Sequence, residues 1–120
     1  MKSIPLFCLV VALAGPGCAF ATHPTALPAV ADAVSPAPGI VSAGRLAADD
    51  IARVREAGIR HVIDLTPDAE TPDFDEAAAV RAAGLLYSNL PLRGALDLTR
   101  ENVMSFDALV RDAERPVLVH

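Results

Sequence analysis

The sequence predicts an α/β fold built around a mostly parallel sheet flanked by helices. Short, β-branched apolar runs alternate with segments of helical periodicity from residue 39 onward, and only short connections separate them. This alternation is typical of βαβ units, in which each helix returns the chain to begin another parallel strand. A length of 120 residues allows one domain.

The N-terminus has the pattern of a secretory signal peptide. Lys2 supplies a positive charge, Ile4 to Ala14 is an apolar run, and residues 19–21 (Ala-Phe-Ala) give the small-x-small pattern of a cleavage site. The apolar run is shorter than the ~20 residues that a transmembrane helix needs. We therefore expect residues 1–21 to be removed as a signal peptide, leaving a secreted or periplasmic (bacterial) protein without membrane association.

Both cysteines of the chain, Cys8 and Cys18, lie within this predicted signal peptide. Lipidation of Cys18 is an alternative, but the residues just before it lack the aliphatic side chain usual three positions upstream. After cleavage the chain has no cysteine, so we expect no disulfide, no thiolate ligand and no thiol nucleophile among its residues. Residues 22–38 are a Pro/Ala-rich linker that we expect to be extended and poorly packed, and the domain is expected to occupy 39–120.

The first elements of the domain follow from periodicity and breakers. Residues 40–43 (Ile-Val-Ser-Ala) lie between two glycines and predict a short strand. Residues 47–57 predict a helix, because apolar side chains recur on one face and Gly58 follows as a C-terminal cap. Residues 61–65 form a nearly continuous apolar run, as in a buried parallel strand, and a turn follows at 66–68.

The second half repeats the pattern. We expect a helix over 73–83 that ends at Gly84, a strand over 85–90, and a loop over 91–98. Thr99 is the expected N-cap of a helix over 100–114, which buries Val103, Phe106, Val110 and Ala113. Residues 116–119 predict a last strand.

This last strand is apolar on both faces, and no helix follows it in the sequence. We therefore expect the fold to be incomplete at the C-terminus, with one face of the sheet uncovered. A folded part of about 80 residues is marginal even when complete. The prediction is a poorly stable or adhesive domain.

Composition argues against two classes of function. Removal of Lys2 with the signal peptide takes the net charge from −5 to −6, so we expect no nucleic-acid binding, which requires a basic face. The three histidines have no metal-ligand spacing, so we expect no metal and no other cofactor.

Three segments together resemble one family. Residues 61–70 (HVIDLTPDAE) are similar to its V-I-N-x-R-P-D-x-E segment, residues 94–99 (GALDLT) to its G-D-I-T loop, and residues 116–120 (PVLVH) to the strand that precedes C-R-S-G-T-R. The family is the beta-lactamase hydrolase-like phosphatases, a bacterial branch of the tyrosine and dual-specificity phosphatase fold. The resemblance covers residues 38–120.

The resemblance implies phosphomonoester hydrolysis through a cysteine thiolate held at a helix N-terminus, with an aspartate protonating the leaving oxygen. Asp97 matches the loop aspartate and is the candidate general acid, although it could serve only to complement the helix dipole at Thr99. His120 matches the residue before the nucleophile, where its imidazole would orient the catalytic loop. Without that loop, it would be a strand-end histidine bonded to backbone.

Other polar residues near these segments have simpler roles. Asp64 and Glu70 lie at the ligand side of the predicted sheet but are expected to cap structure. Thr66 stands where the family often has arginine, which weakens an anion-binding role for that loop. Arg93 is expected to be a solvated surface arginine, and His61 to be structural.

Three interpretations stay open. The printed sequence stops at His120 and supplies no nucleophile, so we expect these residues alone to be inactive as a phosphatase whose catalytic half is missing. A second interpretation is a noncatalytic pseudophosphatase or binding remnant. A third is a fragment of a rhodanese-like sulfur transferase, which would also need a cysteine loop but no acid at Asp97. If the catalytic loop exists, the partner is a phosphorylated substrate.

Overall fold

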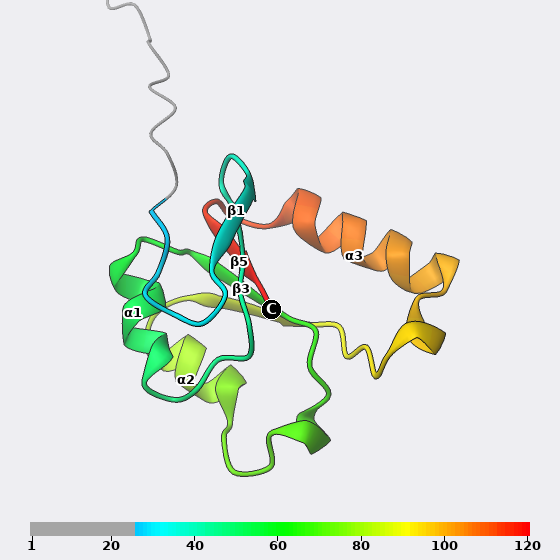
Figure 1. Cartoon of the computed structure of the whole chain (residues 1–120), viewed down its shortest axis with the longest axis horizontal. Helices are drawn as coiled ribbons and strands as arrows, with labels where there is room; N and C mark the ends of the chain where they lie inside the picture. The colour runs from blue at the N-terminus through cyan, green and yellow to red at the C-terminus, as the bar shows by residue number, and fades with distance from the viewer. Residues whose placement is uncertain (1–25) are drawn as a thin grey trace, which may run out of the picture.

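A computed structural model describes residues 26–120 of the chain. Five strands form one sheet in the order β1-β2-β5-β3-β4 (Figure 1). The strands are β1 (Val34–Ala37), β2 (Ile40–Ser42), β3 (His61–Asp64), β4 (Leu86–Asn89) and β5 (Val117–Val119). β2, β5, β3 and β4 are parallel, whereas β1 pairs with β2 in the antiparallel sense. The predicted α/β class and mostly parallel sheet are thus confirmed.

The two faces of the sheet are covered by different helices. α1 (Asp50–Glu56) and α2 (Glu76–Ala82) pack on one face, where their residues Ile51, Val54 and Val80 join the main core cluster. α3 (Arg100–Asp112) lies against the other face (Figure 1). A smaller cluster around Ile63, Val117 and Val119 forms there. The sheet is therefore covered on both sides, although unequally.

The helices begin later than the periodicity predicts. Residues 47–49 form a turn in which the Asp50 carboxylate accepts the Ala47 N–H, so α1 begins at Asp50. α2 begins at Glu76 because the Asp75 carboxylate accepts the Ala78 N–H and caps it. Short competing hydrogen bonds of this kind favour caps over helix interiors.

The predicted caps are found. Gly58 and Gly84 both have positive φ, +83° and +80°, where a residue with a Cβ is strained. Thr99 accepts the N–H of Asn102 and caps α3, as predicted. Short 3₁₀ turns, η1 (Asp68–Glu70) and η2 (Ala95–Asp97), lie in the loops after β3 and β4.

Two expectations differ from the structure. The segment expected to be a linker up to residue 38 contains β1, and Val30 packs against the main core cluster, so the folded part begins before Gly39. Val103 was expected to be buried but is 52% exposed, because the N-terminal half of α3 projects beyond the sheet (Figure 1). In contrast, Phe106 and Val110 do pack on the sheet, and Ala113 is buried.

The predicted signal peptide (1–21), its cleavage after Ala21, the two cysteines and His23 lie outside the described residues. Within residues 26–120, none of the helices has the length and apolar character to cross a bilayer.

Candidate functional site

The end of β5 carries a histidine whose backbone is held in the sheet. The His120 N–H donates to the Ile63 carbonyl at 3.1 Å, and the His120 carbonyl accepts the Leu65 N–H at 2.8 Å. β5 lies between β2 and β3, so His120 leaves the centre of the sheet at its carboxyl edge. Ligands of open parallel sheets bind outside this edge.

The His120 ring meets two buried carboxylates on the face that α2 covers. Nε2 lies 2.6 Å from Oε1 of Glu76 and 3.8 Å from Oδ1 of Asp64. The side chain of His120 is fully buried, and those of both acids are almost so. Burial of two carboxylates is costly unless hydrogen bonds or charges compensate.

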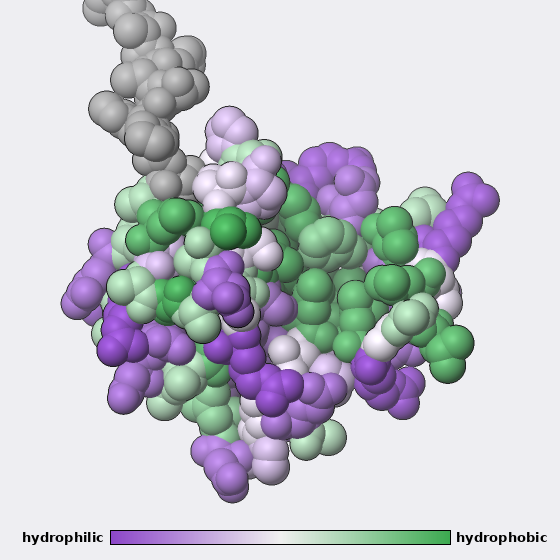
Figure 2. All heavy atoms as spheres, in the orientation of Figure 1, coloured by the Kyte–Doolittle hydropathy of each residue, from purple (hydrophilic) through white to green (hydrophobic). Residues whose placement is uncertain are grey.

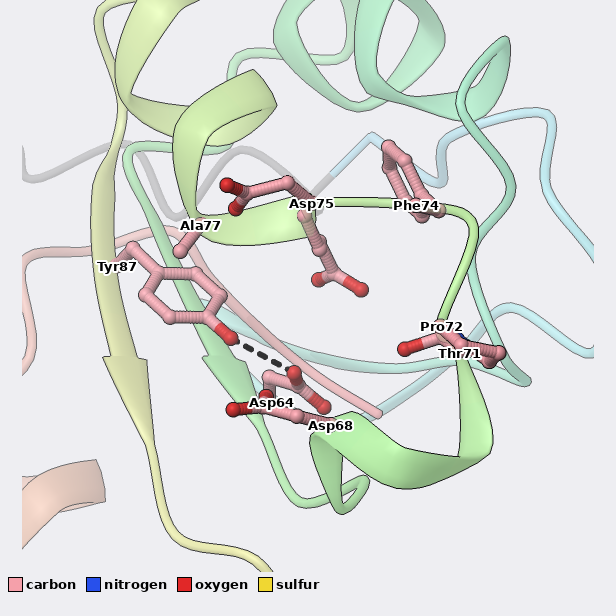
Figure 3. Close-up of a pocket in the computed structure, with 9 residues that line it drawn as sticks. Asp64, Asp68, Thr71, Pro72, Phe74, Asp75, Ala77 and Tyr87 are labelled. Atoms are coloured by element: carbon pink, nitrogen blue, oxygen red, sulfur yellow. Dashed lines mark hydrogen bonds between the residues drawn. The ribbon is translucent and has the colours of Figure 1, made fainter.

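Asp64 is held by two further donors. The Tyr87 hydroxyl donates to Oδ2 at 2.7 Å (Figure 3). The Thr66 N–H donates to Oδ1, also at 2.7 Å. The Thr66 bond is the capping role that the sequence predicts for Asp64. Burial, followed by the bond to the Asp64 carboxylate, raises the pKa of Tyr87 strongly, so the phenol stays protonated and remains a donor.

A cavity of about 290 Å³ adjoins these acids (Figure 3). Its wall includes four carboxylates and two aromatic rings, and no lysine, arginine or histidine lines it. These residues are Asp64, Asp68, Asp75, Glu76, Phe74 and Tyr87. A phosphate dianion would be repelled here, so this cavity does not fit the phosphate group of a phosphomonoester.

Asp64, Glu76 and His120 also form a set of possible metal ligands, with their donor atoms within 4.8 Å of one another. Spacing of histidines could not reveal this set, because two of its members are carboxylates from other elements. In the present arrangement, however, His120 and Glu76 are hydrogen-bonded at 2.6 Å. Two ligands of one tetrahedral zinc ion lie roughly 3.3 Å apart. The geometry describes a hydrogen-bonded cluster, and the side chains would have to separate to admit an ion.

Asp97 lies elsewhere, in η2 at the end of the loop that follows β4, whereas the C-terminal residue lies just past the end of β5 (Figure 1). Its Oδ2 accepts the backbone N–H of Arg93 at 2.8 Å and lies 3.4 Å from Arg93 Nε. These hydrogen bonds, the backbone one first, lower the pKa of Asp97. A general acid must carry a proton before transfer, so the arrangement in this structure favours the wrong protonation state for that role.

The remaining candidates are explained by local contacts. Glu70 forms a surface ion pair with Arg45 at 2.5 Å, and Arg93 is largely exposed and pairs with Asp97. His61 lies on the opposite face of the sheet from His120, with Nε2 2.9 Å from the Ser88 hydroxyl. Burial lowers the pKa of His61, partly offset by Glu114.

Glu76 is the residue that sequence reasoning missed. Its position at the start of α2 resembles an ordinary first-turn acid that complements the helix dipole. The adjacent acids Asp75 and Glu76 are the signal that could have revealed it. One acid is enough to cap the helix, so the second is available for another role.

The α/β fold is that of phosphatase-like structures. A candidate phosphatase of the DUF442 group from Shewanella putrefaciens superposes with a TM-score of 0.66 at 28% identity, covering 76% of this chain and 59% of that one. P. aeruginosa TpbA, solved with phosphotyrosine, has the same fold, with a TM-score of 0.60 at 21% identity over 79% of this chain and 58% of that one.

A family model for the phosphatase-like domain of beta-lactamase hydrolase-like proteins matches residues 30–120, and the chain belongs to this family. The beta-lactamase hydrolase-like protein of Xylella fastidiosa is 34% identical over 76 residues, which is 60% of this chain. The match spans only 17% of that relative's length. The resemblance proposed from three short segments is thus confirmed.

Proposed function

We propose that this domain serves cysteine-dependent hydrolysis of phosphomonoesters at the carboxyl edge of its sheet. The observation that carries the proposal is the placement of His120, which ends the central strand with a buried side chain, at the position that precedes the nucleophile in the resembling family. Family membership and the fold shared with phosphatases support it.

In this reaction a cysteine thiolate attacks phosphorus, an S–P bond forms and the P–O bond to the leaving group breaks. The leaving oxygen takes a proton from an acid, and water then cleaves the S–P bond and releases phosphate. Among the described residues, His120 and the carboxylates behind it contribute orientation. Asp97 would supply the proton only if its side chain released the hydrogen bonds from the backbone and side chain of Arg93.

The described residues contain no cysteine. We expect residues 22–120 alone to give no turnover of p-nitrophenyl phosphate, because they contain no cysteine to supply the attacking thiolate. Reproducible hydrolysis that survives orthogonal purification steps would contradict this expectation.

The decisive experiment reads the transcript beyond the codon for His120 and assays its full product. Codons for Cys-x-x-Gly-x-Arg, with activity lost on replacement of that cysteine by serine, support the proposal. A product that carries this motif but transfers sulfur from thiosulfate to cyanide, and hydrolyses no phosphomonoester, overturns it in favour of a sulfur transferase. A stop codon overturns it in favour of a noncatalytic binding role.

Asp97→Asn separates the two enzymatic outcomes in an active product. Phosphatase turnover falls by about tenfold or more if Asp97 is the acid, whereas sulfur transfer is unchanged. Asp107→Asn, a solvent-exposed aspartate of α3, is the control and alters neither.

Export is part of the same proposal. We expect the mature protein to begin at residue 22 and to be secreted or periplasmic, as the N-terminal pattern predicts. Mass spectrometry of the protein from the periplasmic fraction of a bacterial host tests this. An intact N-terminus, or a lipid mass on Cys18, would contradict it.

A further inference from the structure

Glu76 is a buried acid that helix capping does not explain. It is 6% exposed and begins α2, but Asp75 already caps this helix through the N–H of Ala78. The side chain of Glu76 instead turns to the end of β5, where Oε1 meets His120 Nε2 at 2.6 Å. A carboxylate placed in a core at such desolvation cost is retained where its acceptor oxygen has a specific donor.

The backbone of His120 is fixed in the sheet. Its N–H is paired with Ile63 of β3 and its carbonyl with Leu65, just after β3, so the remaining freedom is rotation of the side chain. The oxygens of an ionised carboxylate can only accept, so with Glu76 ionised the proton that joins the pair sits on Nε2. Nδ1 is buried and has no hydrogen-bond partner among the described residues, so the bond to Glu76 is the side-chain hydrogen bond that orients this buried ring.

Asp64 does not replace Glu76 in this task. Its oxygens are engaged by Thr66 and Tyr87, and the nearer one is 3.8 Å from Nε2. The charged or titratable groups that face the ring are thus Asp64 from β3, Glu76 from α2 and, through Asp64, Tyr87 from β4. No arginine or lysine of residues 26–120 forms an ion pair with either acid.

We infer that Glu76 is a positioning residue that holds the His120 ring in one orientation with Nε2 protonated. The purpose of this orientation rests on the proposed function, since a loop that cradles phosphate must be held in place before substrate arrives. The orientation of the ring itself rests only on the contacts of Glu76.

The test observes the imidazole Nε2–H proton by NMR in the ¹⁵N-labelled 120-residue chain, at about pH 8, where free imidazole is neutral. With three histidines in the chain, His120→Gln assigns the resonance by its loss. The wild type is expected to show a downfield proton that exchanges slowly with water. Glu76→Ala removes it, and Glu76→Gln, which keeps a neutral acceptor, shifts it upfield and speeds its exchange at least tenfold. Glu101→Gln, an exposed first-turn acid of α3, is the matched control and leaves the resonance unchanged.

A resonance unaffected by Glu76→Gln overturns the inference, even if Glu76→Ala does not fold. A resonance that disappears on addition of Zn²⁺ and returns with EDTA also overturns it, because the cluster would then be a metal site. None of these readouts needs turnover. A longer gene product without phosphatase activity would therefore remove the proposed function and leave the role of Glu76 standing.

Discussion

The two faces of the sheet are packed to different degrees. On the side of α1 and α2, residues of these helices and of β2, β3 and β5 pack in a cluster whose central members, such as Val54 and Val62, are fully buried. On the side of α3, the helix contributes no buried residue of its own, and an apolar cavity of about 150 Å³ remains beneath its first turns.

Exposed apolar side chains gather on the α3 side. Figure 2 shows apolar residues over η2 and the start of α3. They include Leu96, Leu98, Val103 and Met104. This difference indicates that apolar packing on the α1/α2 face supplies most of the folding stability, whereas the attachment of α3 depends on few buried contacts.

The sharpest test of this difference places the same substitution on both faces. Leu118→Ala, on the α1/α2 side of β5, removes a fully buried side chain and is expected to cost about 3 kcal/mol of unfolding free energy. Leu109→Ala, from the half-buried inner side of α3, is expected to cost about 1 kcal/mol. Urea unfolding of both variants measures the difference. Equal losses would show that the two faces contribute equally.

A truncation tests how far the better-packed side extends toward the N-terminus. Removal of residues 26–38 deletes β1 and Val30, which packs against the α1/α2 cluster. We expect the chain that begins at residue 39 to melt more than about 5 °C below the chain that begins at residue 26. Circular dichroism melts of the two proteins decide this, and identical melting temperatures would restore the domain boundary predicted from the sequence.

Tyr87 tests the polar edge of the same face. Tyr87→Phe leaves one oxygen of the buried Asp64 without its donor and is expected to cost about 1–2 kcal/mol. Because the folded state raises the pKa of the phenol, the stabilisation is complete below about pH 10, the unfolded pKa, and is lost as the pH rises above it. The wild type should therefore lose stability on going above pH ~10, and the variant should lose less. Parallel loss in both proteins would contradict the assignment.

His61 gives the smallest expected effect, on the α3 side. Its folded pKa is lowered, mainly by burial, so its neutral form is the stable one in the folded state. The stabilisation is present above the unfolded pKa of about 6.5 and is lost as the pH falls through the lower folded value. His61→Asn should flatten the decline in melting temperature between about pH 7.5 and about pH 5. A decline that persists in the variant would place its origin in other titratable groups and contradict this role of His61.

The sequence predicted the alternation of elements, the caps at Gly58, Gly84 and Thr99, and the burial of the last strand, because these depend on local periodicity and turn chemistry. β1 was missed because Pro36 and its neighbours indicate a linker, although residues 38–39 form the short turn of a hairpin with β2. The carboxylate cluster was missed because it depends on long-range contacts. Glu76 and His120 lie 44 positions apart, and only the fold brings them together.

The position of β5 in the sheet has a consequence for how the protein is made. β5 is the last of the described strands to be synthesised, yet it lies between β2 and β3 and separates the β1-β2 pair from the β3-β4 pair. Until β5 leaves the ribosome, β2 and β3 each lack the strand that pairs with them in the folded sheet, and their backbone N–H and C=O groups on that edge have no ladder partner. The complete sheet can therefore form only after β5 has been synthesised. A product that ends before residue 117 would lack the central strand and is expected to be bound by chaperones or degraded by proteases.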